Sequence, residues 1–347
     1  MDARCIHAAV SGINASDNPA PGVGVAKSLR AVHDYDWKIA GLAYDAMEPG
    51  IYLDDVFDHS YMVPYPSAGH ESLLDRLYYI HDQFKLDIIL PTLDAELPFY
   101  MQSESELREH GIETFLPTRE QYRLRAKDKL AELAEKTGLE LPPQIIVSSY
   151  DELSKAAAEL GYPVMIKGSI YKAYRAYSLD EAMNNFAKII AQWGYPVIVQ
   201  KVITGEEMNV IGAGDGEGGV LGLVAIKKMS VTELGKIWTG VTISHPAMLR
   251  AAREFVENTK WRGGFELECM VDGDKVWLIE INPRFPAWVY FATGVGVNLP
   301  AQLVRKALGL PVDKRQEYET GKLYIRYTEE KIVDMTVFQN MVTSGES

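Results

Sequence analysis

Residues 265–284 read FELECMVDGDKVWLIEINPR, and this stretch decides which fold the rest of the chain must fit. Its Asp272-Gly273 pair is a strong signal for a tight turn, and the residues on both sides alternate as they do in paired strands. The pattern predicts a β-hairpin. The extended, glycine-punctuated runs that precede it from about residue 201 predict further antiparallel strands, with helices packed on one face of the sheet.

Acidic side chains occur inside these otherwise apolar strands. Glu266 and Glu268 share a face of the first strand, and Glu280 and Asn282 share a face of the second, so that carboxylates from paired strands can converge. Like charges facing each other are destabilising, and a buried unpaired carboxylate is worse. A divalent cation removes both costs, and oxygen ligands suit Mg²⁺. The pattern predicts a magnesium site; the alternative is a solvent-facing strand edge with salt bridges.

The composition is that of a folded, soluble protein. Its 347 residues suit two or three packed subdomains, and 47% of them are hydrophobic and 24% charged. The net charge of −13 and the absence of a block of Lys and Arg argue against nucleic acid as a partner. Any site for a phosphate must therefore be local.

The cysteines and the apolar runs indicate the compartment. Cys5 and Cys269 each lie in an apolar run typical of a buried strand, which predicts no disulfide framework. The apolar run near the first residue breaks at Ser11 and Gly12, too early for a signal peptide. No apolar stretch approaches the roughly 20 residues that span a bilayer. We expect a cytoplasmic protein without a membrane segment.

The predicted domain order follows from the change in pattern along the chain. Residues 1–118 alternate short strands and helices, which predicts a parallel sheet wrapped by helices. Loops at the carboxyl ends of such strands form ligand crevices, so Asn14, Asp17 and Asp94 are candidates for holding a second substrate; ordinary solvated loop residues are the alternative.

Three further segments complete the predicted organisation. Residues 119–140 read as linker helices, and residues 141–200 as a compact α+β module that is small enough to move as a lid. Residues 201–347 form the antiparallel domain that contains the hairpin. The expected fold class is thus α/β followed by α+β.

The string ECMVDGDKVWLIEINPR resembles the metal-binding hairpin of the ATP-grasp superfamily. That resemblance implies a Rossmann-like pre-ATP-grasp domain, a small α+β lid and a C-terminal antiparallel domain. It implies that Glu268, Glu280 and Asn282 hold Mg²⁺, with Mn²⁺ as an alternative ion. Arg284 would lie beside the transferred phosphate or the substrate carboxylate, where its planar fork makes bidentate contacts.

The same resemblance implies a set of nucleotide contacts elsewhere. Lys129 resembles a first nucleotide-contacting lysine, and Lys167 in YPVMIKGS a second, facing the α and β phosphates. The segment VQKVITGEEMNV resembles the hinge that reads adenine, followed by a ribose-binding acid. These residues are Gln200, Lys201, Val202, Ile203 and Glu207. Among Lys227, Lys228 and Lys236 we expect phosphate contacts late in the reaction, with Lys236 placed beside Arg284 in catalysis; a solvated surface is the alternative for all three lysines.

The activity implied by the resemblance is that of an ADP-forming ligase. It most resembles the carbamoyl-phosphate-synthase-like and carboxylate-amine ligase branches, with ATP, a carboxylate and an amine as small-molecule partners and a homodimer as a common state. No GxSxG, HExxH or GxxxxGK[ST] motif competes with this interpretation. One departure is the segment from Gly168 to Ser178, which has a single glycine where the family has a glycine-rich loop; Lys172 and Arg175 can substitute by direct charge.

Two alternatives stay open at this point. The first is formation of carboxyphosphate from bicarbonate, as in the biotin carboxylase branch. The second, motivated by the glycine-poor loop, is a regulatory protein that binds ATP without turnover.

Overall fold

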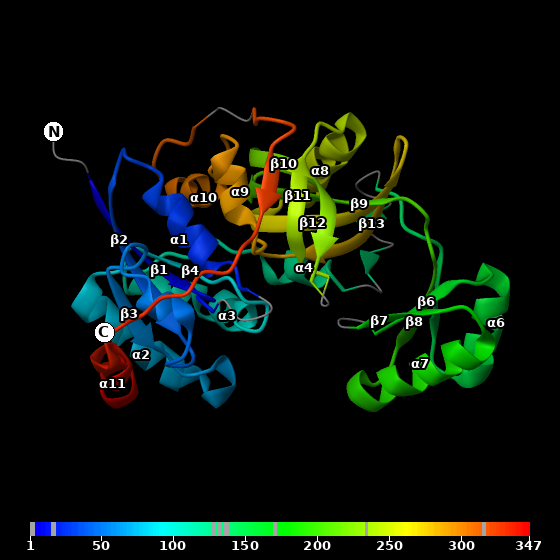
Figure 1. Ribbon diagram of the computed structural model, residues 1–347, viewed down its shortest axis with the longest axis horizontal. Helices are drawn as coiled ribbons and strands as arrows, with labels where there is room; N and C mark the ends of the chain where they lie inside the picture. Colours follow the sequence, from blue (N-terminus) through cyan, green and yellow to red (C-terminus); the bar gives the residue numbers. More distant parts are fainter. Residues whose placement is uncertain are drawn as a thin grey trace.

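The computed structural model of the chain describes residues 4–14, 19–126, 129–130, 133–134, 139–168, 172–232, 235–313 and 317–347. Each of its three sheets forms the centre of a separate unit (Figure 1). We call them the first unit, containing β1 to β4, the lid, containing β5 to β8, and the third unit, containing β9 to β14. The lid stands apart from the other two units in Figure 1.

The first unit contains a parallel sheet in the order β3-β2-β1-β4. Its strands are buried and apolar, as expected when helices cover both faces of a parallel sheet. The strands are β1 (Cys5–Ser11), β2 (Asp36–Ala43), β3 (His59–Met62) and β4 (Ile88–Leu90). The helices are α1 (Gly22–Arg30), α2 (His70–Phe84) and α3 (Leu97–Glu109), with short 3-10 turns η1 (Pro49–Tyr52) and η2 (Pro66–Ala68).

The lid is an antiparallel sheet in the order β5-β8-β6-β7, with two helices on one side (Figure 1). Both helices begin at a serine, Ser149 or Ser178, whose side chain accepts a hydrogen bond from the backbone N–H three residues on. The elements are β5 (Gln144–Val147), α6 (Tyr150–Leu160), β6 (Val164–Gly168), β7 (Ala173–Ala176), α7 (Leu179–Trp193) and β8 (Val197–Lys201).

The third unit is a larger antiparallel sheet in the order β13-β12-β9-β10-β11-β14. The predicted hairpin forms two neighbouring strands at one edge of it. The strands are β9 (Glu206–Asp215), β10 (Val220–Val231), β11 (Ile237–Thr242), β12 (Arg262–Asp272), β13 (Lys275–Asn282) and β14 (Leu323–Ile325). The helices are α8 (Pro246–Thr259), α9 (Val289–Gly294) and α10 (Leu299–Ala307).

The segment between the first unit and the lid begins with a capping box. The Thr118 side chain accepts from the backbone of Gln121, and the Gln121 side chain accepts from the backbone of Thr118, which starts α4 (Arg119–Arg123). The rest of the linker predicted over 119–140 is described only in part, because residues 127–128, 131–132 and 135–138 lie outside the described residues.

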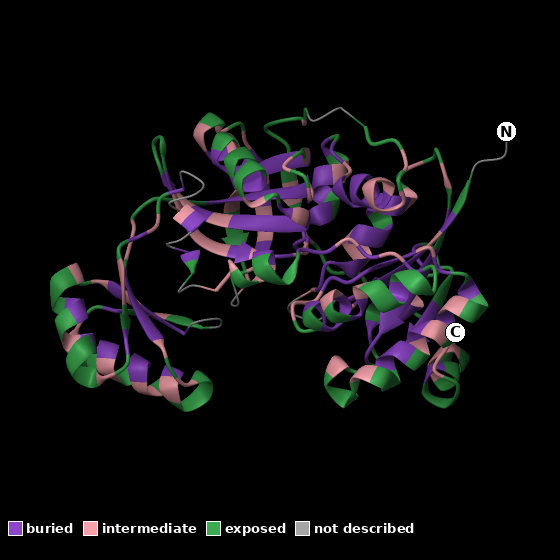
Figure 2. Ribbon diagram, turned by 180° about the vertical axis from the view of Figure 1, so that it is seen from behind, coloured by how far each residue is buried: buried purple, intermediate pink, exposed green. Residues whose placement is uncertain are grey.

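Buried side chains show which units are packed as one body. One apolar cluster joins Val25 of α1 in the first unit to Val289 of α9 and Ile211 of β9 in the third unit. The cluster of the lid contains only residues between Val147 and Val199. Figure 2 shows the buried residues concentrated in the strands and the outer surfaces of the helices exposed. The first and third units therefore share a core, whereas the described lid residues pack among themselves.

Two features differ from the predicted organisation. The tail after about residue 334, for which the sequence pattern predicts no element, forms a helix, α11 (Met335–Thr343), and the Asp334 side chain caps it by accepting from Thr336 N. The chain then pairs with β3: Met62 N donates to Gly345 O at 2.8 Å, and Ser347 N donates to Ser60 O at 3.0 Å. The end of the segment predicted to belong to the third unit thus packs on the first unit (Figure 1).

The predicted fold class is confirmed, because a parallel α/β unit is followed by two antiparallel α+β units. Among the described helices none is both long enough and apolar enough to cross a bilayer.

Candidate active site

The register of the hairpin carries a β-bulge. Near the Asp-Gly turn, β12 and β13 pair as a two-residue turn dictates, but Ile279 has no partner in the ladder. Beyond it Glu268 pairs with Glu280, and Glu266 pairs with Asn282. Residues directly opposite each other on antiparallel strands point to the same face. The bulge therefore brings these four side chains to one face of the sheet.

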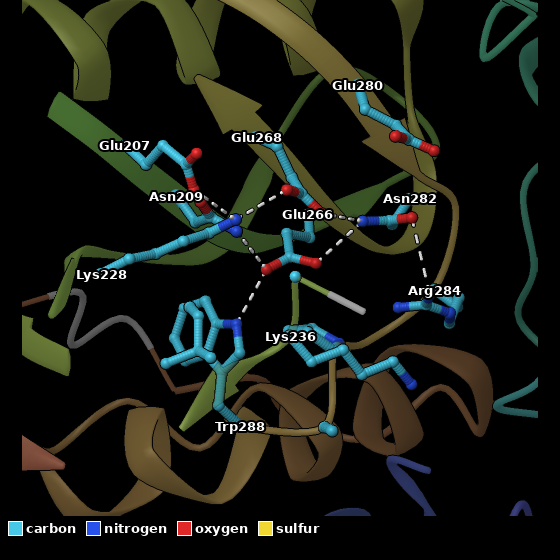
Figure 3. A pocket seen from close by; sticks show the side chains of 14 residues that line it. Glu207, Asn209, Lys228, Lys236, Glu266, Glu268, Glu280, Asn282, Arg284 and Trp288 are labelled. Carbon is cyan, nitrogen blue, oxygen red and sulfur yellow. Dashed lines mark hydrogen bonds and ion pairs between the residues drawn. The ribbon is translucent and has the colours of Figure 1, made fainter. Parts of the chain in front are cut away.

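This face forms one wall of a cavity of about 340 Å³. Figure 3 shows the acidic side chains of the hairpin on one side of it and Lys236 and Trp288 on the other. The wall opposite the hairpin comes from the start of β11 and from the segment after β13. The lining residues are Glu207, Asn209, Lys228, Gly235, Lys236, Ile237, Glu266, Glu268, Glu280, Asn282, Arg284, Pro286, Ala287 and Trp288.

Glu266 is the most deeply buried acid in this cavity, at 4% exposure. Its Oε1 accepts from Asn209 Nδ2 at 2.7 Å and from Trp288 Nε1 at 2.8 Å, and its Oε2 accepts from Asn282 Nδ2 at 2.9 Å. Burial raises the pKa of Glu266, and the neighbouring Glu268 carboxylate raises it further. Three neutral donors thus satisfy a carboxylate that would otherwise be costly to bury.

Lys228 forms an ion pair with two of the lining acids. Its Nζ lies 2.9 Å from Glu268 Oε2 and 3.4 Å from Glu207 Oε2, and its side chain is 8% exposed. Burial alone lowers the pKa of Lys228, but the surrounding carboxylates, Glu268 first, outweigh it and raise the pKa above its usual range. The ammonium group is therefore firmly charged at neutral pH.

Arg284 connects the hairpin to the first unit. Its guanidinium donates to Asp94 Oδ2 at 3.0 Å, and Nη2 lies 3.5 Å from Asn282 Oδ1. Asp94 also pairs with Arg125 at 3.3 Å. Burial lowers the pKa of Arg284, but the charges of Asp94 and Glu266 more than compensate and raise it. The loop after β4 thus contributes a carboxylate at the edge of the cavity.

Lys236 is the second cation on the wall opposite the hairpin, and the described part of the chain gives it no acidic partner. Its Nζ donates to Pro19 O at 3.3 Å, and no carboxylate of the described residues lies within 4.0 Å of it. Burial, and after it the positive charge of Arg284, lower the pKa of Lys236 to about 8. Lys236 and Arg284 together give this side of the cavity a positive character, which suits an anionic group.

A second cavity of about 170 Å³ lies between the lid and the third unit. It shares Glu207, Lys228 and Glu268 with the first cavity, so the two are neighbours. Buried Lys167 donates to Gln200 Oε1 at 2.6 Å, and Gln200 donates to Gln144 Oε1 at 2.9 Å. The lining from the lid and the hinge is Pro142, Met165, Lys167, Arg175, Gln200, Lys201, Val202 and Ile203.

Most of the predicted site residues line these two cavities, and a few do not. Lys227 forms an ion pair with Glu206 and lines neither cavity, whereas its neighbour Lys228 lines both. Lys129 is exposed and lines neither. Of the candidates for a second substrate, Asp94 pairs with Arg284.

The other two candidates for holding a second substrate are Asn14, which lines neither cavity, and Asp17. The side chain of Asn14 accepts from Ala20 N at 3.1 Å and so closes its own loop. Asp17 lies outside the described residues. In the segment with one glycine, predicted to be a loop, Arg175 lies on β7 and lines the second cavity, and residues 169–171 lie outside the described residues.

Asn209 and Trp288 are site residues that the sequence prediction does not name, whereas it names Glu266 among the converging acids but gives it no role as a ligand. Asn209 lies two residues after Glu207 on β9, so the strand period of two predicts that both face one side. Nothing in the sequence pattern around Trp288 indicates that its indole reaches a buried carboxylate.

The chemistry of the donor set fits Mg²⁺. Glu268, Glu280 and Asn282 offer hard oxygen ligands on one face, and Mg²⁺ typically takes one or two carboxylates together with substrate phosphates. Among the described residues no group of three or more His, Cys, Asp or Glu side chains is placed to hold a metal ion. Asn282 and the substrate phosphates would therefore have to supply ligands beside the two carboxylates.

Solved structures share the fold of this chain over most of their length. The ADP complex of purK, N5-carboxyaminoimidazole ribonucleotide synthetase, matches with a TM-score of 0.68 at 14% identity, over 92% of this chain and 80% of that one. A biotin carboxylase–ATP analogue complex from Campylobacter jejuni matches with a TM-score of 0.69 at 15% identity, over 92% and 74%. L-amino acid ligase from Bacillus licheniformis matches with a TM-score of 0.65 at 16% identity, over 88% and 74%.

The chain therefore has the fold of these proteins, and the resemblance of the hairpin to ATP-grasp proteins is confirmed by a family match that spans it. Residues 195–331, which include both strands of the hairpin, match the family described as ATP-grasp in the biosynthetic pathway with Ter operon.

Proposed function

We propose that the chain is an ATP-dependent carboxylate-amine ligase that passes through an acylphosphate and releases ADP and phosphate. The observation that carries the proposal is the convergence of Glu268, Glu280 and Asn282 on a cavity that adjoins the lysine-containing cavity under the lid. One cavity is suited to the phosphates and metal, and the other to the rest of a nucleotide.

The lid cavity supplies the proposed nucleotide site. Lys167 is buried on β6 and lines this cavity, where its ammonium group can donate to the α and β phosphates. The backbone from Gln200 to Ile203 lines the place proposed for the adenine base. Glu207 lies near the start of β9, just after this hinge, and its carboxylate would accept hydrogen bonds from the ribose hydroxyls. For the phosphate contact predicted at Lys227 we propose Lys228 instead, because it lines both cavities.

The chemistry follows from charge and position. An oxygen of the substrate carboxylate attacks the γ-phosphorus, the bond to the β,γ-bridging oxygen breaks, and ADP leaves with that electron pair. The amine then attacks the acyl carbon, the C–O bond to phosphate breaks, and the amine loses a proton. Arg284 and Lys236 stabilise the negative charge that develops on the transferred group, while bound Mg²⁺ neutralises the nucleotide phosphates.

The experiment that tests this function is ADP release against pools of carboxylates and amines, with hydroxylamine present to trap an acylphosphate. We expect hydroxamate to form only when a carboxylate, ATP and Mg²⁺ are present together. ADP release that depends on bicarbonate instead would favour carboxyphosphate formation. ATP-analogue binding by calorimetry without ADP release over the whole panel would favour a regulatory ATP-binding protein.

The pH dependence of turnover tests the role of Lys236. Because its pKa in the ligand-free protein is about 8, we expect kcat/KM to fall as the pH rises through about 8 and the ammonium loses its charge. Lys236→Arg keeps the charge and is expected to remove this fall. Profiles of kcat/KM from pH 6 to 10 for both proteins check that Lys236 causes the fall. An identical fall in Lys236→Arg would mean that another group causes it.

The same lowered pKa makes a prediction for stability. The pKa falls from 10.5 to about 8 on folding, so between these values the unfolded chain binds more protons than the folded one. The contribution of Lys236 to the free energy of unfolding therefore rises with pH across that window. Denaturant unfolding of the wild type and Lys236→Met at pH 7.5 and 9.5 gives the change in the free energy of unfolding with pH for each protein. We expect this free energy to rise more, or fall less, between the two pH values in the wild type than in the variant.

A further inference from the structure

Both oxygens of the Glu268 carboxylate are already engaged. Oε2 accepts from Lys228 Nζ at 2.9 Å, and Oε1 accepts from Asn282 Nδ2 at 3.0 Å. Figure 3 shows the Lys228 ammonium between Glu207 and Glu268, on the side of the cavity where the acids converge. An ion that binds Glu268 therefore competes with these two donors for the negative charge of the carboxylate, and it comes close to the Lys228 ammonium. The protein's own ammonium thus occupies a contact that a metal needs.

Displacing Lys228 has a cost that depends on what else is bound. Its side chain is 8% exposed, and its other acidic partner, Glu207, is farther away at 3.4 Å. A nearly buried ammonium that loses its closest carboxylate is strongly unfavourable unless a new anion replaces it. A divalent ion beside the ammonium adds repulsion. A nucleotide phosphate removes both penalties, because it provides an anionic partner for Lys228 from the adjoining cavity.

We propose that Lys228 is an internal placeholder cation that makes Mg²⁺ binding at Glu268 and Glu280 conditional on a nucleotide phosphate. The inference rests on the proposed nucleotide site and adds an order to it: metal alone binds weakly, and the metal–nucleotide pair binds cooperatively. By linkage, a bound metal also releases Lys228 toward the phosphates. Such coupling keeps the site free of adventitious divalent ions between turnovers.

The adjacent lysine provides a matched control. Lys227 lies next to Lys228 on β10, carries the same charge and also forms an ion pair, with Glu206. Its side chain is exposed and lines neither cavity, because neighbouring residues of a strand point to opposite faces. Removing either charge changes the net charge of the protein equally, so a difference between the two variants reports position.

The decisive experiment measures Mn²⁺ binding in the absence of nucleotide, with electron paramagnetic resonance as the readout. It compares the wild type, Lys228→Met and Lys227→Met. We expect Lys228→Met to bind Mn²⁺ about tenfold or more tightly than wild type, because a like charge has been removed from the ion's immediate surroundings. We expect Lys227→Met to stay within about twofold of wild type. Adding Glu280→Gln to Lys228→Met is expected to abolish the increase in Mn²⁺ affinity. This result would show that the additional Mn²⁺ binds at Glu280.

A second measurement guards against a folding defect. Mn²⁺ is expected to raise the melting temperature of Lys228→Met more than that of wild type, because binding only to the folded state stabilises it. If Lys228→Met does not fold, Lys228→Gln carries the same test. Unchanged or weaker nucleotide-free Mn²⁺ binding in the folded variant overturns the placeholder role, even if ADP release proceeds normally.

The outcomes separate this inference from the proposed function. In one outcome, the wild type binds Mn²⁺ only in the presence of ADP, and Lys228→Met binds nucleotide-free Mn²⁺ no more tightly than the wild type. This outcome contradicts the placeholder role of Lys228 and leaves the proposed metal–nucleotide site in place. No Mn²⁺ binding in any variant, with or without ADP, contradicts the metal site itself and with it the ligase proposal.

Discussion

Glu280→Gln is expected to lower magnesium-dependent ADP formation by about 100-fold to 1,000-fold and to leave the fold unchanged. Glutamine keeps the size and one oxygen but removes the charge that a divalent ion requires. The partner across the ladder, Glu268, shares its charge with Lys228, so the substitution leaves the ion with one partly neutralised carboxylate. Coupled-enzyme detection of ADP over a range of Mg²⁺ concentrations measures the loss, and circular dichroism checks the fold.

The control for this prediction lies on the same hairpin. Asp274→Asn removes one negative charge at the exposed turn and is expected to leave turnover within about twofold of wild type, since exposed charges at such distances are largely screened. If Glu280→Gln turns over ATP at the wild-type rate with an unchanged Mg²⁺ requirement, Glu280 is not a ligand of the metal.

Arg284→Lys is expected to reduce turnover by about 100-fold while changing the affinity for an ATP analogue much less. The Arg284 guanidinium lies 3.0 Å from Asp94 and also lines the cavity. The ammonium group of the lysine variant cannot contact Asp94 and a group in the cavity at the same time. Steady-state kinetics with saturating ATP and calorimetry with a non-hydrolysable analogue separate the two effects. The expected signature is a low kcat with nearly normal nucleotide binding.

A matched arginine distinguishes lost chemistry from lost packing. Arg305 is similarly little exposed, at 12% for its side chain, and pairs with Asp34 at 3.0 Å, but it lines neither cavity. Arg305→Lys is expected to change the melting temperature about as much as Arg284→Lys does, with turnover retained. Equal losses of turnover in both variants would mean that Arg284 acts through the fold.

Much of the architecture could be predicted because local patterns carry it. The alternation of strand and helix in the first unit, the serine caps of the lid helices and the Asp-Gly turn each specify their element with neighbouring residues alone. The segment after residue 334 could not be placed, because what holds it is distant: Met341 is buried in the core shared by the first and third units, and Arg76 donates to Gly345 O at 2.7 Å.

The hairpin shows the limit of local reasoning most clearly. A two-residue turn followed by an uninterrupted ladder pairs Glu268 with Ile279 and leaves Glu280 on the opposite face of the sheet. The convergence predicted from the sequence is present, but it depends on the bulge at Ile279. A bulge without glycine has no sequence signal that alternation reveals. The choice between Lys227 and Lys228 depends in the same way on register, which is set by the pairing of β10 with β9 and β11.

The pairing of residues 345–347 with β3 has a consequence for how the chain folds as it is made. β3 is an edge of the first sheet, and Tyr61 is bridged there by Glu346. During synthesis β3 leaves the ribosome long before residues 345–347, so its own chain cannot cover this edge until that segment arrives. Open edges are where strands of other chains attach. The nascent first unit is therefore most exposed to aggregation during the interval in which the lid and the third unit are still being translated.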